Sequence, residues 1–223
     1  ARLENCWLMV EIIAIDGPAG SGKSSVSKQV ARELGYGYLD TGAAYRALAW
    51  AVQAGIVENL DGAPASALKS FDYSISLEPD DFWVRVGNQD VTQAIREPEI
   101  SETVSQVAKI SEVRHFMKDL TRKLVERSDF PGVVVEGRDI TTVVAPDAKN
   151  RLLLTASEEV RLRRRSAELA PEAAKNVERQ VSQRDAQDAK VVDFMTPAAG
   201  VKLVDSTELN FEQTVSAVLE AVR

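Results

Sequence analysis

Five short apolar runs recur along the chain, and stretches with helical spacing lie between them. The first run, Val10 to Ile15, is continuous and rich in β-branched residues, which is typical of a strand buried on both faces of a parallel sheet. The other four runs lie at 37–40, 132–137, 151–156 and 201–205. Strands that alternate with helices predict an α/β fold with right-handed crossovers.

Three of the helical stretches carry a clear apolar face. Val26, Val30 and Leu34 recur at helical spacing, and Gly35 is placed to end that helix. The last helix is expected to begin with Asn210 as its N-cap and Gln213 three residues later. The other two apolar stripes consist of Val113, Phe116, Leu120 and Leu124, and of Phe211, Val215, Val218 and Val222.

Two regions break the alternation of strand and helix. Residues 71–91 contain short strand-like runs separated by the turn sequences at 78–81 and 87–88, which predict a small antiparallel meander inserted into the main fold. Residues 157–190 are strongly charged and helical, with one break near Pro171.

The octapeptide GPAGSGKS follows the first predicted strand and precedes the first predicted helix. This order is the context that the pattern G-x-x-x-x-G-K-[ST] requires for a phosphate-binding P-loop. Glycines let the backbone N–H groups converge on phosphate oxygens, and the helix N-terminus adds its positive dipole end. Lys23 would reach the β- and γ-phosphates, and the Ser24 hydroxyl would join the shell of a Mg²⁺ ion. The expected ATP-binding residues are Gly17, Pro18, Ala19, Gly20, Ser21, Gly22, Lys23, Ser24 and Ser25.

The composition of the chain indicates which classes of partner such a site can have. The 223-residue chain is 44% hydrophobic and has a net charge of −7, so it is typical of a globular protein whose surface repels polyanions, and we expect no nucleic-acid partner. No secretory signal or membrane span is evident, and the single Cys6 fits a reducing compartment. We therefore expect a cytoplasmic monomer without a membrane partner.

Other segments discriminate among P-loop proteins. The chain lacks the guanine-reading N-K-x-D segment of GTPases and the L-S-G-G-Q segment of transporter ATPases. Small kinases remain, and these need several arginines to neutralise the transferring phosphoryl group. The arginines Arg161, Arg164 and Arg165 share one face of a predicted helix, although a solvated basic face is the alternative reading.

Five segments in a fixed order resemble bacterial cytidylate kinase: IDGPAGSGKSS, LDTGAAYR, SQVAKISEVR, VVEGRDITTVV and QRDAQD. The resemblance runs from about Ile13 to the C-terminus. It implies a three-layer α/β/α P-loop fold in a single kinase domain, with its core at 1–64, 111–156 and 191–223. It further implies an acceptor-binding insertion of strands and helices at 65–110 and a helical lid at 157–190.

The resemblance also assigns roles to particular residues. It implies that Thr41, Arg46 and Arg114 hold the acceptor nucleotide and its phosphate, and that Ser105 lies near the cytosine ring. It implies that Asp40 lies near the metal. Trp83 and Tyr73 are interpreted as packing residues, and His115 receives no chemical role.

The remaining implied contacts concern the base, the ribose and the transferring phosphoryl group. Arg138 and Asp139 would read the pyrimidine, since a carboxylate accepts from the amino group of cytosine but repels the carbonyl of uracil. By the same resemblance, Arg161, Arg164, Arg165 and Arg184 would clamp phosphates, and Asp188 would bind the ribose. The chain departs from the family at Val191, where an arginine is usual, and Lys190 would supply only a point charge there.

The resulting hypothesis is a Mg²⁺-dependent transfer of the γ-phosphoryl group of ATP to CMP or dCMP. A P-loop kinase of another small metabolite is one alternative. A nucleotide-dependent switch protein without turnover is another.

Overall fold

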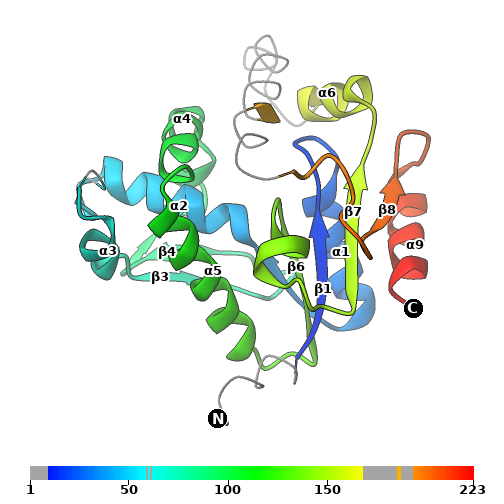
Figure 1. Ribbon diagram of the computed structural model, residues 1–223, viewed down its shortest axis with the longest axis horizontal. Coiled ribbons are helices and arrows are strands. Elements are labelled where there is room, and N and C mark those ends of the chain that lie inside the picture. The colour runs from blue at the N-terminus through cyan, green and yellow to red at the C-terminus, as the bar shows by residue number, and fades with distance from the viewer. Residues whose placement is uncertain (1–9, 59, 61, 168–184, 187–192) are drawn as a thin grey trace. The chain divides into compact units, whose positions relative to one another are not determined.

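The computed structural model describes residues 10–58, 60, 62–167, 185–186 and 193–223 (Figure 1). The chain divides into two compact units. The parallel-sheet unit comprises Val10–Tyr38 and Phe130–Arg223, and the meander unit comprises Leu39–Asp129. The meander unit is wider than the predicted insertion at 65–110, because it also takes in the helices that flank it.

The parallel-sheet unit is built on a five-stranded sheet with the strand order β2-β6-β1-β7-β8. The strand pairs β1–β6, β1–β7 and β7–β8 are parallel, with Ile13 opposite Val134 and Asn150. The strands are β1 (Glu11–Asp16), β2 (Gly37–Asp40), β6 (Gly132–Gly137), β7 (Asn150–Thr155) and β8 (Lys202–Asp205). The continuous apolar runs form the strands of this sheet. Every residue of β6, and every residue of β1 after Glu11, is buried.

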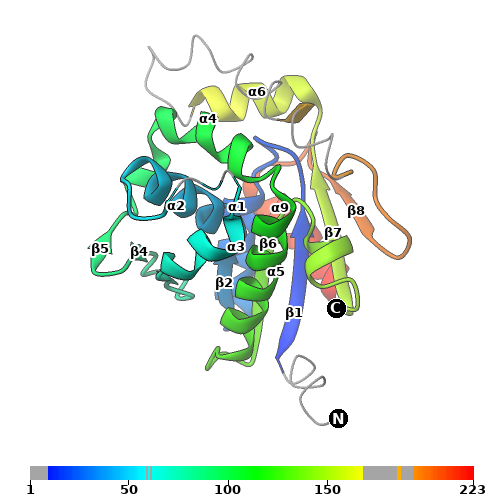
Figure 2. The ribbon, with the colours of Figure 1, turned by 60° about the vertical axis from the view of Figure 1, so that its left-hand side comes forward.

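Among the residues of this unit that the structure describes, three helices and one short turn accompany the sheet. They are α1 (Lys23–Leu34), α6 (Glu158–Ala167), α9 (Phe211–Val222) and the π-helical turn η4 (Ile140–Val144). Helices α1 and α9 pack against each other and against the sheet, so they cover the same face of it (Figures 1 and 2). Helix α1 ends at Gly35 in the left-handed region, and a capping box between Asn210 and Gln213 begins α9.

The meander unit combines helices with a three-stranded antiparallel sheet of order β3-β4-β5. Its strands are β3 (Tyr73–Ile75), β4 (Val84–Val86) and β5 (Gln89–Asp90). Its helices are α2 (Thr41–Gln53), α3 (Pro64–Ala67), η2 (Leu68–Ser70), η3 (Ala94–Arg96), α4 (Pro98–Val107) and α5 (Ser111–Glu126). Helix α2 packs against α4, α5 and β4 and carries a nearly continuous buried face of alanines.

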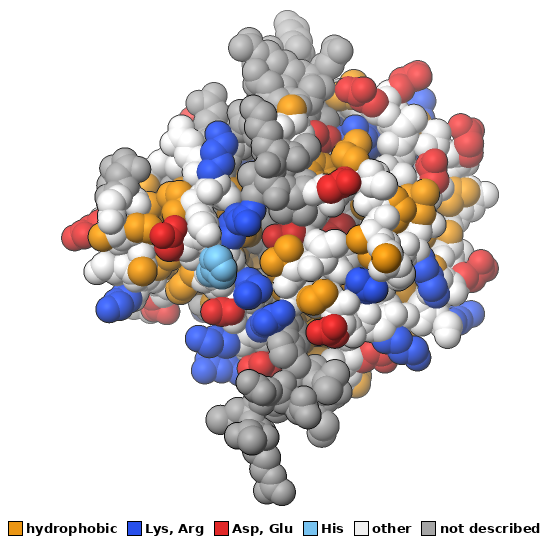
Figure 3. All heavy atoms as spheres, in the orientation of Figure 1, with side chains coloured by type: hydrophobic (Ala, Val, Ile, Leu, Met, Phe, Trp, Pro, Cys, Tyr) orange, Lys and Arg blue, Asp and Glu red, His pale blue; other side chains and the backbone are white. Residues whose placement is uncertain are grey.

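The fold class predicted from the sequence is confirmed: a central parallel sheet with flanking helices carries an antiparallel insertion. Of the helical region predicted at 157–190, Glu158–Ala167 forms α6, whereas the expected break near Pro171 lies outside the described residues. Acidic and basic side chains are interspersed on the face drawn in Figure 3.

Candidate phosphate-binding site

The loop between β1 and α1 has the backbone that the P-loop pattern predicts. Gly20 and Gly22 have φ angles of 75° and 84°, in the left-handed region that favours glycine. A Cβ on Gly17 would lie 2.2 Å from the carbonyl oxygen of Leu154, so this position has no room for a side chain. Lys23 begins α1, and Ser24 is exposed in its first turn. The loop thus presents a helix N-terminus and a lysine together, which is suited to an anion.

Asp16, the last residue of β1, fixes the segment that follows β6. Its carboxylate accepts hydrogen bonds from the backbone N of Ile140 (2.9 Å) and from both the N (2.8 Å) and the Oγ1 (2.6 Å) of Thr141. Burial raises the pKa of Asp16, while these hydrogen bonds and the charge of Lys23 act in the opposite direction. Arg138 and Asp139 therefore belong to a turn that is tied to the start of the P-loop.

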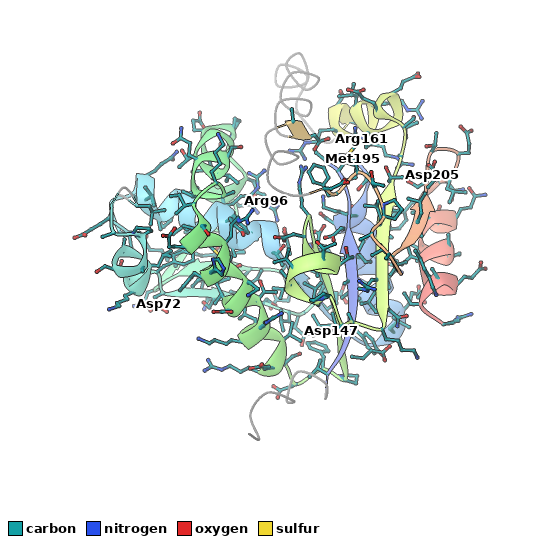
Figure 4. The ribbon with its side chains drawn as sticks, in the orientation of Figure 1. Asp72, Arg96, Asp147, Arg161, Met195 and Asp205 are labelled. Carbon is teal, nitrogen blue, oxygen red and sulfur yellow. The ribbon has the colours of Figure 1, made fainter. Side chains whose placement is uncertain are left out.

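A carboxylate that the sequence analysis did not single out joins several of the predicted residues. Asp185 accepts from Nη1 of Arg138 (2.8 Å) and from Nη1 of Arg161 (2.6 Å), and its Oδ1 also accepts from the backbone N of Ala19 (3.2 Å). Arg161 donates as well to the carbonyl oxygen of Ala19 (2.8 Å). The structure thus brings Arg138, Arg161 and the P-loop together in one cluster. Arg161 belongs to α6 and is labelled in Figure 4.

Arg138 and its neighbours lie at the carboxyl end of β6. The guanidinium of Arg138 stacks on the buried ring of Phe194, 4.3 Å from the ring centroid. Asp139 precedes η4, and its backbone carbonyl accepts from the N–H groups of Val143 and Val144. Glu136 is buried within β6 and accepts from the hydroxyl of Tyr38 (2.6 Å). The pyrimidine-reading roles predicted for Arg138 and Asp139 stay predictions.

The arginines of α6 differ in their surroundings. Nη1 of Arg164 donates to the carbonyl of Ser21 (3.3 Å) and to Oγ of Ser206 (2.9 Å), and its Nη2 donates to the carbonyls of Ser206 (2.8 Å) and Leu209 (3.2 Å). Burial lowers the pKa of Arg164, with the charge of Arg163 as a second cause. Arg165 is half-buried on the same helix. Arg164 therefore ties the P-loop to the chain after β8.

Two predicted acceptor residues, Thr41 and Arg46, and the predicted metal neighbour Asp40 lie in or next to the first turns of α2 in the meander unit. Asp40 is the N-cap of α2: its Oδ1 accepts from the N of Ala43 (3.1 Å), and its Oδ2 pairs with Nη2 of Arg96 (3.1 Å). Thr41 is buried, and Nη1 of the buried Arg46 donates to the carbonyl of Ile95 (3.2 Å). Both carboxylate oxygens of Asp40 are thus engaged, and its role near a metal stays a prediction.

Two buried groups of the meander unit have polar atoms without a hydrogen-bond partner among the described residues: Nη1 of Arg114 on α5 and the hydroxyl of Tyr73 on β3. Burial raises the pKa of Tyr73 well above its usual range, and the charge of Asp40 adds to this effect. Ser105, the predicted neighbour of the cytosine ring, is buried on α4. Unmet buried donors are costly, so a ligand oxygen within reach of either atom would be stabilised.

The sequence analysis missed some site residues and named others that lie outside the described residues. Arg184 and Asp188 belong to the second group, as do Lys190 and Val191. Asp185 and Arg96 were missed because each meets its partner across a long stretch of chain. Asp185 stands inside the quoted segment QRDAQD, so its position next to Arg184 was the available signal.

Among the helices that the structure describes, none is long and apolar enough to cross a membrane. Within the same residues, no cluster of three or more His, Cys, Asp or Glu side chains has the arrangement of a metal site.

Comparison with known proteins agrees with this geometry. A model of the cytidylate kinase family matches residues 13–223. The cytidylate kinase of Cutibacterium acnes is 44% identical over 216 residues, which cover 95% of this chain and 95% of that protein. The cytidylate kinase of Caldanaerobacter subterraneus is 39% identical over 216 residues, covering 95% and 94%. That of Streptomyces avermitilis is 38% identical over 213 residues, covering 95% and 92%. The chain belongs to the cytidylate kinase family.

Proposed function

We propose that this protein transfers the γ-phosphoryl group of ATP to CMP or dCMP, forming ADP and CDP or dCDP. The observation that carries the proposal is the cluster in which Arg138, Arg161 and the backbone of Ala19 meet beside a P-loop. A binding protein needs the P-loop, but a set of guanidiniums beside its tip is what a transferring phosphoryl group requires.

The P-loop and Lys23 would hold the β- and γ-phosphates of ATP. An oxygen of the acceptor phosphate then forms a bond to the γ-phosphorus, while the bond from that phosphorus to the bridging oxygen of ADP breaks. The negative charge passes to the terminal oxygen of ADP, where Lys23 and the backbone N–H groups stabilise it. The acceptor oxygen is already ionised near neutral pH, so no general base is required.

The donor set at the P-loop fits a Mg²⁺ ion that arrives with ATP. The Ser24 side chain is exposed in the first turn of α1, directly after Lys23. Mg²⁺ in such sites keeps several waters and takes one or two protein oxygens together with phosphate oxygens. When bound, the ion would neutralise charge on the phosphates, and Ser24 would hold it.

The family resemblance assigns several residues to the acceptor nucleotide. Arg46 and Arg114 would bind its phosphate, with Thr41 and Ser105 contributing hydroxyl groups. Asp139 would accept a hydrogen bond from the amino group of cytosine, which disfavours UMP because uracil places a carbonyl there. As the family resemblance implies, Arg165 and Arg184 would clamp phosphates, and Asp188 would bind the ribose.

A coupled assay with CMP, dCMP, UMP, AMP and shikimate as acceptors tests the proposal. We expect turnover with the cytidine nucleotides at a kcat/KM at least about 100-fold above that with UMP, because a mismatched buried polar pair costs several kcal/mol. A preference for another acceptor would favour a kinase of a different metabolite. Tight ATP binding without ADP production in the presence of CMP would favour a nucleotide switch.

Lys23→Ala provides the matching test of the P-loop. We expect this substitution to reduce phosphoryl transfer by at least about 1,000-fold, because it removes a charge that acts on the transition state. The thermal unfolding midpoint should stay close to that of the wild type, since Lys23 is not part of the apolar core. Retained turnover in this variant would contradict the assignment of the loop.

A further inference from the structure

Asp185 connects three separate segments of the parallel-sheet unit. Its Oδ1 accepts from the backbone N of Ala19 in the P-loop and from Nη1 of Arg138 after β6, and its Oδ2 accepts from Nη1 of Arg161 on α6. Only 9% of the Asp185 residue surface is exposed. A buried carboxylate with two guanidinium partners is a strong and directional link, because charge-assisted hydrogen bonds are short and about twice as strong as neutral ones.

The hydrogen bonds of Arg161 show which edge of its guanidinium is held by the protein. Nη1 bonds to the Ala19 carbonyl at 2.8 Å and to Asp185 at 2.6 Å, whereas the buried Nε has no hydrogen-bond partner in the part of the chain that the structure describes. Arg161 is 5% exposed, so water does not readily satisfy this donor. One edge is thus fixed to the P-loop, and Nε remains available for an oxygen of a ligand.

The backbone of α6 reinforces this placement. A Cβ on Gly20 would lie 2.5 Å from the carbonyl oxygen of Arg161, so the helix packs directly on the P-loop at this residue. The long side chain of an arginine nevertheless has several rotamers, and backbone contact alone does not select one. The bond to Asp185 restricts that choice.

Asp185 also offsets repulsion between like charges. Arg138 and Arg161 donate to the same carboxyl group, so their guanidiniums lie near each other in a site with little exposure. Without the carboxylate, two such cations would repel and take up different positions. Phe194 supports Arg138 from one side at 4.3 Å, but an aromatic ring does not cancel the charge of a second guanidinium.

We propose that Asp185 is a positioning residue for phosphoryl transfer, which sets Arg161 and Arg138 relative to the P-loop so that Nε of Arg161 faces the transferring phosphoryl group. This inference rests on the proposed function and adds to it a residue that touches no substrate. Asp185 remains paired while ATP is bound, because the phosphoryl group takes the donors that the carboxylate leaves open.

The first experiment compares Asp185→Asn with Asp147→Asn. Both remove one negative charge, but Asp147 is exposed near the start of β7, at the end of the sheet opposite Arg161 (Figure 4). For Asp185→Asn we expect kcat to fall about 10- to 100-fold with the KM for ATP changed less than about threefold, because misplacement of a catalytic group by about 1 Å costs this much. Asp147→Asn should equal the wild type.

A double-mutant cycle separates positioning from a general structural role. In the wild-type background, Arg161→Lys should lower kcat about 100-fold, because lysine lacks the Nε donor. In the Asp185→Asn background, the same substitution should cost less than about fivefold more, since the arginine is already misplaced. Asp185→Glu, which keeps the charge, should recover part of the turnover.

The outcomes distinguish the two proposals. Full additivity in the cycle, or a kcat for Asp185→Asn equal to that of Asp147→Asn, would overturn the positioning role while leaving the kinase assignment intact. Absence of CMP-dependent turnover in the wild type would overturn the proposed function itself. If Asp185→Asn fails to fold, the cycle is carried out with Asp185→Glu, for which additivity again contradicts the proposal.

Discussion

In the parallel-sheet unit, Arg138 and Arg161 share the carboxylate of Asp185, whereas in the meander unit Nη1 of Arg114 is buried with no hydrogen-bond partner among the described residues. The buried hydroxyl of Tyr73 in the meander unit likewise has no hydrogen-bond partner among the described residues. In the first unit, Arg138 and Arg161 share a counter-charge and only Nε of Arg161 is left without a partner among the described residues of that pair. In the second unit, the unpartnered atom of Arg114 is a terminal donor that a bound molecule would satisfy. The contrast suggests that substitutions in the first unit affect both stability and turnover, and that those in the second affect mainly acceptor binding.

Among the substitutions that compare the two units, Arg138→Ala should have the largest effect. The substitution removes the pyrimidine contact proposed for Arg138 and its ion pair with Asp185, so we expect kcat/KM for CMP to fall about 100- to 1,000-fold. The free energy of unfolding should also fall, by about 1.5–3 kcal/mol, the range for hydrogen bonds to charged groups. Steady-state kinetics and urea unfolding measure the two quantities. Arg127→Ala, an exposed change at the end of α5, is the control and should alter neither.

Arg114→Ala should produce a different profile. We expect the KM for CMP to rise about 10- to 100-fold, corresponding to loss of the charge-assisted hydrogen bond proposed between Arg114 and the acceptor phosphate. Stability should change little, because the buried Nη1 has no partner to lose among the described residues. A stability loss as large as that of Arg138→Ala would remove the contrast between the two units.

Arg164→Gln tests whether every arginine of α6 acts on phosphate. The four hydrogen bonds of Arg164 go to Ser21, Ser206 and Leu209, so we expect a stability loss of about 2 kcal/mol, measured by urea unfolding. Its kcat should stay within about fivefold of the wild type. A loss of turnover comparable to that expected for Arg161→Lys would instead assign Arg164 to the phosphoryl group, as the sequence analysis expected.

Features that depend on local sequence were predictable, and features that depend on distant pairs were not. The strands, the cap at Gly35 and the P-loop each follow from residues that are neighbours in the sequence. The pairs Arg96–Asp40 and Arg138–Asp185 join residues 56 and 47 positions apart, and no periodicity marks such pairs. The turn η4 was missed for the same reason, because Asp16 holds it across more than 120 residues.

Tyr73→Phe gives the smallest expected effect and examines the unpartnered donors most directly. Near neutral pH the variant should be at least as stable as the wild type, because the substitution removes a buried hydroxyl that has no hydrogen bond to lose among the described residues; a loss of about 1 kcal/mol would reveal a partner. Burial raises the pKa of Tyr73, so the folded state keeps the proton while the unfolded chain releases it near pH 10. Wild-type stability that is present below pH 10 is therefore lost above it, by up to about 1.4 kcal/mol per pH unit, and Tyr73→Phe abolishes this component. Urea unfolding of both proteins between pH 7 and pH 11 measures the difference, and parallel curves over that range would place the hydroxyl in contact with water.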